Sequence, residues 1–478
     1  MASTVDLPSH QQRVLALDAL RGLSVLLMVF ASSIPFGVAL PSWLYHAQEP
    51  PPTNVFNPHL PGITWVDLVF PFFLFTMGAA IPIALSKRLR GRASPWRVLP
   101  TVLWRFVLLV GFAVYVAQIR PQVISNNPNS AVWLAALVGF ALLFPALARF
   151  PKDWSKTRKY SVRIGGWIGA VILMALLRFP DGSGFSLYRS DIIILVLANV
   201  ALFGGVIWLF TREHLFARLG IMGFLIALRL SAGTSGWIQA LWNLSPVPWA
   251  YQLRFLQYLL IAIPGTIVGD LLVKSMDSFS GQSATEKSWD SKRMFSISAV
   301  MVIINVAVVA GLEAQWVFGT TVISVFLCMV GWQLLKTPVS PNERLLNTLY
   351  KWGVYWFLLG MFFEPYEGGI KKDPSTLSYY FVTSGLAIFA LMAMIIFVDV
   401  FQKKKGFAFL IDSGQNPMVA YAGINSLILP LLALTRLNVL LHDITPTPWL
   451  GVLGGAFVTY LVALATTIFT RKKIFLRT

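Results

Sequence analysis

Charged side chains are scarce in this sequence of 478 residues: only 12% are Asp, Glu, Lys or Arg, whereas 56% are hydrophobic. A soluble domain carries about 25% charged residues. So few charges cannot cover a water-facing surface of this size, and lipid must therefore be the solvent for most of the chain. The composition excludes an ordinary soluble protein and predicts an all-α, polytopic transmembrane bundle.

Cysteine is nearly absent as well, and with it the usual metal and disulfide frameworks. The one cysteine, Cys328, lies in an apolar stretch and is best interpreted as a small buried residue. The sequence also lacks GxSxG, HExxH, a Walker loop, and GxGxxG followed by an acid. Hydrolase, metalloprotease and nucleotide-driven pump therefore lack support, and no metal is expected.

What the sequence has in abundance is long apolar stretches, and about fourteen of them are long enough to span a bilayer. They lie at 16–39, 63–86, 97–118, 131–150, 161–178, 190–211, 215–232, 252–273, 294–313, 316–335, 346–364, 376–401, 406–434 and 449–470. No internal repeat interrupts them, and the longest hydrophilic stretch, 274–293, is too short for a domain. We therefore expect residues 1–478 to form one transmembrane domain.

Positive charge is unevenly distributed between the loops. The net charge is +18, which in a soluble protein would suggest nucleic acid, but here Lys and Arg gather in every second loop. No nucleic-acid partner is expected, and the positive-inside rule places both termini in the cytoplasm. Segment 1–12 has no features of a cleaved signal peptide. The basic loops are 86–92, 152–160, 211–218, 274–293, 336–344, 402–406 and 471–473.

Two polar residues occur at the cytoplasmic start of the first stretch. Asp18 and Arg21 are spaced i, i+3, so they share a helix face and can form an ion pair. An interfacial ion pair is the favoured interpretation on composition alone. The alternative is an anchor for the phosphate of a cofactor.

The first loop on the far side carries two of the five histidines, His46 and His59, and Asp67 lies within the next helix, close to its N-terminal end. A carboxylate at membrane depth is costly and usually has a partner. If Asp67 orients an imidazole, the free ring nitrogen can act as a general base. A single loop histidine is more often solvated, but this combination makes a catalytic site about as plausible as a structural one.

Two later segments also place polar groups near the membrane. The loop at 364–379 carries Lys372 on the side where cations are rare, and runs into Ser378 and Tyr379. A later apolar helix contains Asn416 and Tyr421, which join helices at least as often as they act chemically. Several other polar residues near span ends are attributed to snorkelling, namely Asn199, Arg229, Arg254, Asp270, Asn305, Glu313 and Arg436.

Three blocks of sequence resemble the heparan-α-glucosaminide N-acetyltransferase family and its bacterial relatives, which include a branch known only as a domain of unknown function. The family's L-D-x-x-R-G opening matches residues 17–22. Its H-A, glycine and D-L-V-F-P pattern matches His46-Ala47, Gly62 and residues 67–71. Its late patterns match Lys372, residues 377–379, Gly414, Asn416 and Tyr421. These motifs lie within 16–86 and 364–425, and the middle, about 120–250, looks unlike the family.

The resemblance implies transfer of an acetyl group from cytoplasmic acetyl-CoA to an amino sugar or envelope glycan across a bacterial inner membrane. It implies His46 as base or acetyl carrier, His59 as its substitute, and Asp67 as the group that orients the imidazole. Lys372, Ser378, Tyr379, Asn416 and Tyr421 would bind the acceptor. Asp18, Arg21, Arg88, Arg97 and Arg105 would meet the CoA phosphates, for which arginine is suited.

Two other functions are compatible with the same residues. Many helices with polar residues at membrane depth also suit a secondary transporter for a sugar or glycan precursor. A relative that binds a glycan without catalysis is the third interpretation. Membrane lipid is an expected partner in every case, and the oligomeric state, a homodimer included, stays open.

Overall fold

The structure is a computed structural model and describes residues 14–89, 94–151, 153–278 and 289–477. The predicted N-terminal segment 1–12, and parts of the predicted basic loops at 86–92, 152–160 and 274–293, lie outside these ranges. The helices are α1 (Leu15–Ala31), η1 (Ser42–Leu44), α2 (Trp65–Leu89), α3 (Pro95–Gln118), α4 (Pro121–Ile124), α5 (Ser130–Leu147), α6 (Lys156–Leu176), α7 (Ile192–Thr211), α8 (Leu215–Ser231), α9 (Trp237–Trp242), η2 (Leu253–Tyr258), α10 (Leu259–Ser278), α11 (Ser291–Glu313), α12 (Val317–Leu334), α13 (Pro341–Phe363), α14 (Leu377–Met394), η3 (Ile395–Val400), α15 (Ala408–Gln415), α16 (Pro417–Gly423), η4 (Ile424–Ile428), α17 (Leu429–Leu434), α18 (Leu437–Ile444) and α19 (Pro448–Arg471).

The prediction of an all-α, polytopic membrane bundle is confirmed. Within the described ranges, 11 helices are long and apolar enough to cross a membrane. The other three predicted stretches are also helical: they correspond to α1 and α8, which have 17 residues each, and to α13. The protein is therefore a multi-pass membrane protein.

Two predicted spans have different boundaries in the structure. The first was expected to reach residue 39, but α1 ends at Ala31, where the hydroxyls of Ser32 and Ser33 both donate to the Val29 carbonyl and Pro35 follows. The stretch 406–434 is divided into α15, α16, η4 and α17. Its first break falls at Pro417, which has no N–H to continue the ladder of α15.

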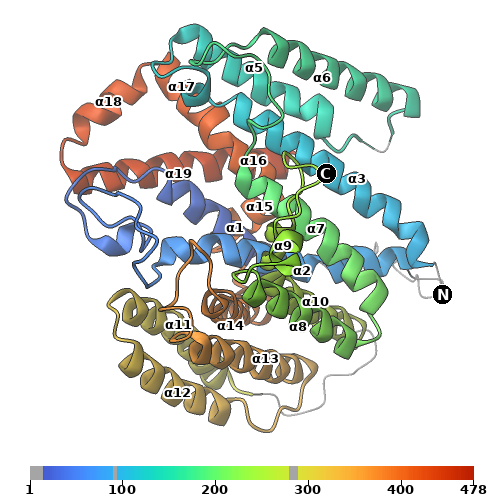
Figure 1. Ribbon diagram of the computed structural model, residues 1–478, viewed down its shortest axis with the longest axis vertical. Helices are drawn as coiled ribbons and strands as arrows, with labels where there is room; N and C mark the ends of the chain where they lie inside the picture. The colour runs from blue at the N-terminus through green and yellow to red at the C-terminus, as the bar shows by residue number, and fades with distance from the viewer. Residues whose placement is uncertain (1–13, 90–93, 152, 279–288, 478) are drawn as a thin grey trace, which may run out of the picture.

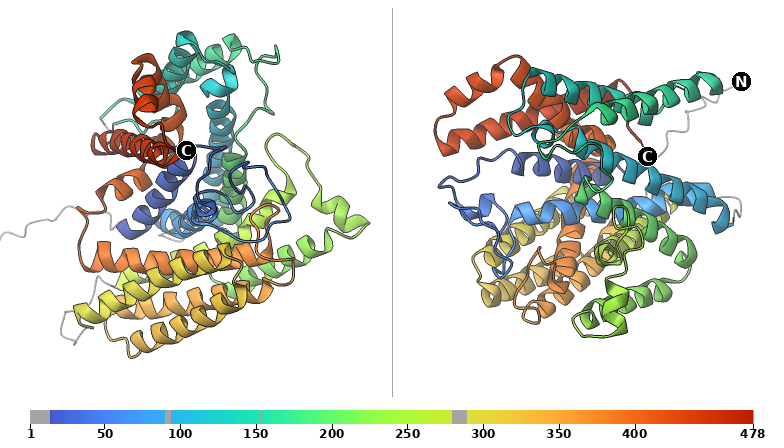
Figure 2. Two further views of the ribbon diagram at one scale, coloured as in Figure 1. Left: turned by 90° about the vertical axis from the view of Figure 1, so that its left-hand side faces the viewer. Right: turned by 45° about the horizontal axis from the view of Figure 1, so that its top comes forward.

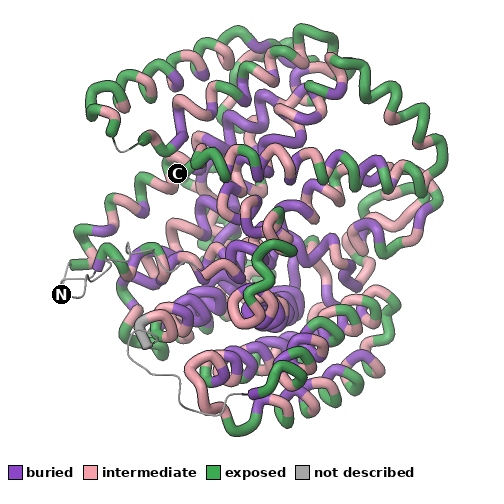
Figure 3. Tube along the Cα trace, turned by 180° about the vertical axis from the view of Figure 1, so that it is seen from behind, coloured by how far each residue is buried: buried purple, intermediate pink, exposed green. Residues whose placement is uncertain are grey.

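Burial separates a central set of helices from a peripheral one. In the most apolar window of each span, 83% of α14 with η3 is buried inside the protein, but only 11% of α6. Large apolar side chains on peripheral helices are open, such as Phe216 (91% exposed) and Phe318 (82%). Figure 3 shows this exposed surface around a buried centre. Lipid is the natural neighbour of such a surface.

Helix α2 lies at the centre of the bundle, between α11–α13 on one side and α5, α6 and α17 on the other (Figures 1 and 2). It packs closely against α10, and a Cβ on Gly78 of α2 would lie 2.2 Å from the backbone oxygen of Ala262. Helices α1 and α15 cross just as tightly at Gly22 and Gly414, where a Cβ on Gly414 would lie 1.7 Å from the Asp18 carbonyl oxygen. Such small residues allow membrane helices to approach closely.

Candidate active site

Asp67 closes the first turn of α2 through a reciprocal capping arrangement with Thr64. The Thr64 hydroxyl accepts from the Val66 N–H at 3.2 Å, and Asp67 Oδ2 accepts from the Thr64 N–H at 2.9 Å. This Thr-x-x-Asp pattern is a capping-box signal, which can be recognised from the sequence alone. It fixes the carboxylate at a helix N-terminus, where the helix dipole favours its negative charge.

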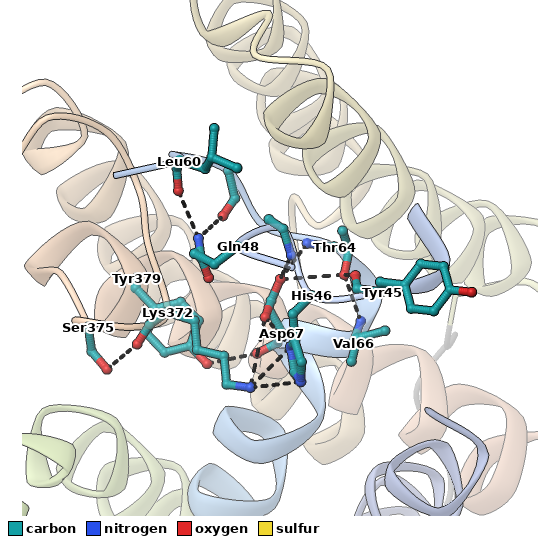
Figure 4. A network of polar contacts seen from close by, with 12 residues as sticks. Tyr45, His46, Gln48, Leu60, Thr64, Val66, Asp67, Lys372, Ser375 and Tyr379 are labelled. Carbon is teal, nitrogen blue, oxygen red and sulfur yellow. Dashed lines mark hydrogen bonds and ion pairs between the residues drawn. The ribbon is translucent and has the colours of Figure 1, made fainter. Parts of the chain in front are cut away.

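His46 completes the environment of this carboxylate. Its Nδ1 lies 2.6 Å from Asp67 Oδ1, and the Ala47 N–H donates to Oδ2 at 3.2 Å. The Asp67 side chain is fully buried, whereas the His46 side chain is 29% exposed. With Nδ1–H donating to Asp67, the lone pair of Nε2 is left for another partner. Figure 4 shows the imidazole beside Asp67, with the Lys372 amine in contact with both side chains.

Lys372, which lies 326 residues later in the sequence, contacts His46. Its Nζ lies 3.1 Å from both His46 Nδ1 and His46 Nε2, and 3.9 Å from Asp67 Oδ1. Burial lowers the pKa of Lys372 from its ordinary value, and the carboxylates of Asp67, Glu49 and Asp373 act in the opposite direction. The structure therefore joins three of the residues that sequence reasoning singled out, His46, Asp67 and Lys372.

The loop that carries Lys372 is held by contacts to two other parts of the chain. The Gly62 N–H donates to the Ile370 carbonyl at 2.7 Å. This bond joins the Lys372 loop to the loop that carries His46. Gly62 has φ +118°, a conformation that suits glycine. On the other side, Arg229 of α8 forms an ion pair with Glu367 at 2.6 Å. Sequence reasoning attributed Arg229 only to snorkelling, so this contact is a correction.

Tyr379 supports the backbone of Asp67. Pro71 lies four residues after Asp67 in α2 and has no N–H, so it leaves the Asp67 carbonyl without its helical donor. The fully buried Tyr379 hydroxyl donates to that carbonyl at 2.7 Å. A buried carbonyl needs a hydrogen-bond donor, most of all in a membrane protein, where no water can supply one. Pro71 and Tyr379, distant in sequence, thus form one structural unit.

Other predicted site residues lie elsewhere. His59 is exposed, and its side chain makes no hydrogen bond or ion pair within the described residues. Ser378 is fully buried and its Oγ has no hydrogen-bond partner in that part of the chain. Tyr421 donates to Asp191 at 2.6 Å, and Arg120 pairs with the same carboxylate. None of these three is brought to His46.

Arginine side chains line a cavity of about 490 Å³ that runs along α2 from its opposite end. The lining arginines are Arg88, Arg105 and Arg477, together with Arg21, which donates to the Thr76 carbonyl near the middle of α2 at 3.2 Å, and apolar residues continue the lining to Phe70. Arg21 also contacts Asp18 at 3.4 Å. The buried Nε of Arg105 has no hydrogen-bond partner in the described chain. Arg97 is exposed and does not line the cavity.

Arg477 was not among the predicted residues, and Asn416 explains how it reaches the cavity. Asn416 Nδ2 donates to the Ile474 carbonyl at 2.8 Å, and the Leu476 N–H donates to Asn416 Oδ1 at 3.1 Å. Both halves of the amide are therefore bound to the C-terminal segment, which places Asn416 in a structural contact away from His46. No motif marks residue 477, so nothing local in the sequence identified it.

The two sites lie at opposite ends of one helix. We call His46, Asp67 and Lys372 the histidine end, and the four lining arginines the arginine end. Asp67 and Arg88 are 21 residues apart on α2, which at ~1.5 Å per residue separates them by about 32 Å. That length is close to the ~30 Å thickness of a bilayer core. The cavity reaches Phe70, one helical turn from Asp67.

Comparison with known families identifies the chain. A family described as "Domain of unknown function (DUF5009)" matches residues 13–272, which is more than half of the sequence. The chain belongs to this family. The DUF5009 match includes α2 with both of its ends, and it also covers the middle region that looked unlike the acetyltransferase pattern.

This DUF5009 chain is also similar to characterised proteins over a shorter range. Heparan-alpha-glucosaminide N-acetyltransferase from Homo sapiens is 31% identical over 106 residues, or 22% of this chain and 14% of the human protein. The Mus musculus protein of the same name is 31% identical over 110 residues, or 23% of this chain and 15% of the mouse protein. The similarity thus covers a small part of each relative, and it supports the resemblance to that family noted in the sequence motifs.

Proposed function

We propose that the protein is a membrane acyltransferase that accepts an acetyl group from acetyl-CoA at the arginine end and delivers it to an acceptor at the histidine end. The proposal rests on one observation: a single helix, α2, joins the two ends, and its residues from Phe70 to Arg88 line the cavity between them. The distant similarity to an acetyltransferase points the same way.

The arginine end suits the phosphorylated part of CoA. Arginine binds phosphate oxygens through paired, charge-assisted hydrogen bonds. Four arginines line the cavity, and the buried Nε of Arg105 would gain a partner there. Beyond them the wall includes Ile81, Met77 and Phe73. These apolar side chains suit the long uncharged arm that carries the thioester.

The histidine end suits proton transfer during acyl transfer. The contact between Asp67 and Nδ1 orients the imidazole, so Nε2 can take the proton of an attacking amine or hydroxyl. Asp67 also stabilises the imidazolium that forms. A general base placed in this way contributes roughly 10²–10⁴-fold to a rate. We assign His46 as the base and Asp67 as its positioning residue.

The acceptor is proposed from chemistry and similarity together. The relatives are named for acetylating the amine of a glucosaminide. We propose an amino sugar or envelope glycan that approaches from the membrane face opposite to the CoA site, in a bacterial inner membrane. His46 can serve an amine or a hydroxyl equally, so both N- and O-acetylation are compatible with this arrangement.

The direct test is acetyl-CoA binding to the purified protein, by calorimetry, for wild type and His46→Ala. We expect both to bind, because His46 does not line the donor cavity. Acetyl transfer to glucosamine should occur only with wild type. If neither protein binds acetyl-CoA, the proposal fails, and uptake of a sugar into proteoliposomes without any donor would then support a transporter.

A further inference from the structure

We propose that Lys372 is an internal acyl acceptor, which becomes an Nε-acyllysine when acyl donor is present and the external acceptor is not. This inference rests on the proposed function, because it needs a donor that reaches His46. It adds a modification site and a form of regulation to the site described above.

The position of the Lys372 amine is the first reason. An acceptor that gives its proton to His46 must lie within about 2.6–3.2 Å of the accepting nitrogen. Lys372 Nζ lies 3.1 Å from both His46 Nε2 and His46 Nδ1, so its amine is already within that distance of the accepting nitrogen. Both side chains are partly open, at 28% and 29% exposed, so an acyl group can reach the pair.

The side chain and the backbone of Lys372 are both held by contacts. Lysine side chains are ordinarily flexible, but Lys372 Nζ contacts His46 and lies 3.9 Å from Asp67 Oδ1. The backbone oxygen of Lys372 accepts from Ser375 Oγ at 2.5 Å, and the ion pair between Arg229 and Glu367 fixes the same loop. The adjacent Lys371 differs: its side chain makes no hydrogen bond or ion pair in the described chain, and its loop contacts are through the backbone. Lys371 therefore provides a matched internal control.

The charge state supports the same conclusion. Only the neutral amine is a nucleophile, and burial lowers the pKa of Lys372, which increases the fraction of neutral amine at a given pH. The three nearby carboxylates reduce this effect without reversing it.

The proposed step is balanced in atoms and charge. The lone pair of Nζ attacks the carbonyl carbon of the acetyl thioester and forms a C–N bond. The C–S bond breaks, and CoA leaves as its thiolate. The proton lost from Nζ passes to His46 Nε2 and then to solvent. Lys372 is left as a neutral amide.

This modification would reduce turnover. An acetylated Lys372 has no charge, so it loses its ion pair with Asp67. Its acetyl group would also occupy the space beside His46 into which the acceptor must come. The protein would therefore slow down when acetyl-CoA is plentiful and acceptor is scarce.

The test uses the full chain in lipid nanodiscs with acetyl-CoA and no acceptor, followed by peptide mapping by mass spectrometry. We expect an acetyl group on Lys372 and none on Lys371. The modification should disappear in His46→Ala and persist in Lys371→Gln. Acetyl transfer from acetyl-CoA to added glucosamine with Lys372 still unmodified would overturn this inference, while leaving the proposed function intact.

A second measurement covers the case in which the protein does not use acetyl-CoA at all, so that the proposed function fails. Limiting N-hydroxysuccinimidyl acetate acylates lysines without any enzyme. Faster acetylation of Lys372 than of Lys371 would support a nucleophilic amine poised for acylation. Equal or slower acetylation of Lys372 would overturn the inference.

Discussion

The two ends of α2 differ in how their charges are balanced. At the histidine end, the buried carboxylate of Asp67 is surrounded by His46, Lys372 and backbone N–H groups, so its charge is compensated within the protein. At the arginine end, four arginines line a cavity whose described lining includes no Asp or Glu, although Asp18 forms an ion pair with Arg21 from outside that lining. The first end has the features of a preorganised reaction site, and the second those of a receptor for an anion.

This difference predicts that substitutions at the two ends affect different measurements. Changes at the histidine end should reduce acyl transfer with little effect on donor binding. Changes at the arginine end should reduce donor binding and leave transfer at saturating donor largely intact. The four predictions below test this separation, from the largest expected effect to the smallest.

Asp67→Asn should lower acetyl transfer by roughly 10²–10⁴-fold, because an amide can neither fix the imidazole tautomer nor stabilise the imidazolium. Acetyl-CoA affinity should stay close to that of wild type. Asp373→Asn is the control, because it removes a nearby charge without contact to His46. Steady-state kinetics and calorimetry measure the two effects. Equal losses in both variants would contradict the role given to Asp67.

Arg105→Ala should weaken acetyl-CoA binding by roughly 10- to 100-fold, since a hydrogen bond between charged partners contributes about 1.5–3 kcal/mol. Arg97→Ala is the matched control on the same helix, because Arg97 is exposed and does not line the cavity. Calorimetric titration of both variants is the measurement. If Arg97→Ala weakens binding as much as Arg105→Ala, the cavity is not the donor site.

Tyr379→Phe should destabilise the protein by about 1–3 kcal/mol, because the Asp67 carbonyl would lose its donor in a buried environment. In a Pro71→Ala background the cost should be smaller, since residue 71 would regain an N–H for the same carbonyl. Thermal unfolding of the four proteins in detergent measures this coupling. Equal costs in both backgrounds would show that Pro71 and Tyr379 act independently.

The pH dependence of lysine labelling gives the smallest effect. Burial lowers the pKa of Lys372, so its amine loses its proton at a lower pH than an ordinary lysine. Its labelling rate with a small acylating reagent should therefore begin to rise at lower pH than that of a free lysine derivative in the same solution. A profile shifted to higher pH would contradict this environment for Lys372.

The sequence alone was sufficient for the fold and for part of the site. Apolar length and composition predicted the membrane helices, because burial in lipid leaves a strong local signal. His46 and Asp67 were found together because they are 21 residues apart in one motif. The contact of Lys372 with His46 was not predicted, because 326 residues separate the two side chains and the resemblance implied only that Lys372 would bind the acceptor.

The site residues that could not be predicted are placed by tertiary contacts that leave no local pattern in the sequence. Arg477 reaches the arginine end because Asn416 and the backbone at Leu147 and Arg149 bind the C-terminal segment. Arg97 and Arg105 lie on the same helix in a similar sequence context, and only the packing of α3 decides which of them faces the cavity. Arg229 is an ordinary span-end arginine in the sequence, but it forms the ion pair that holds the Lys372 loop.

The central claim is that donor and acceptor are used at opposite ends of α2 and hence at opposite faces of the membrane. The most direct test is a proteoliposome assay with acetyl-CoA outside the vesicles and glucosamine sealed inside them. The account predicts N-acetylglucosamine inside and free CoA outside, with Asp67→Asn inactive. Product that forms only when donor and acceptor share one compartment would contradict it.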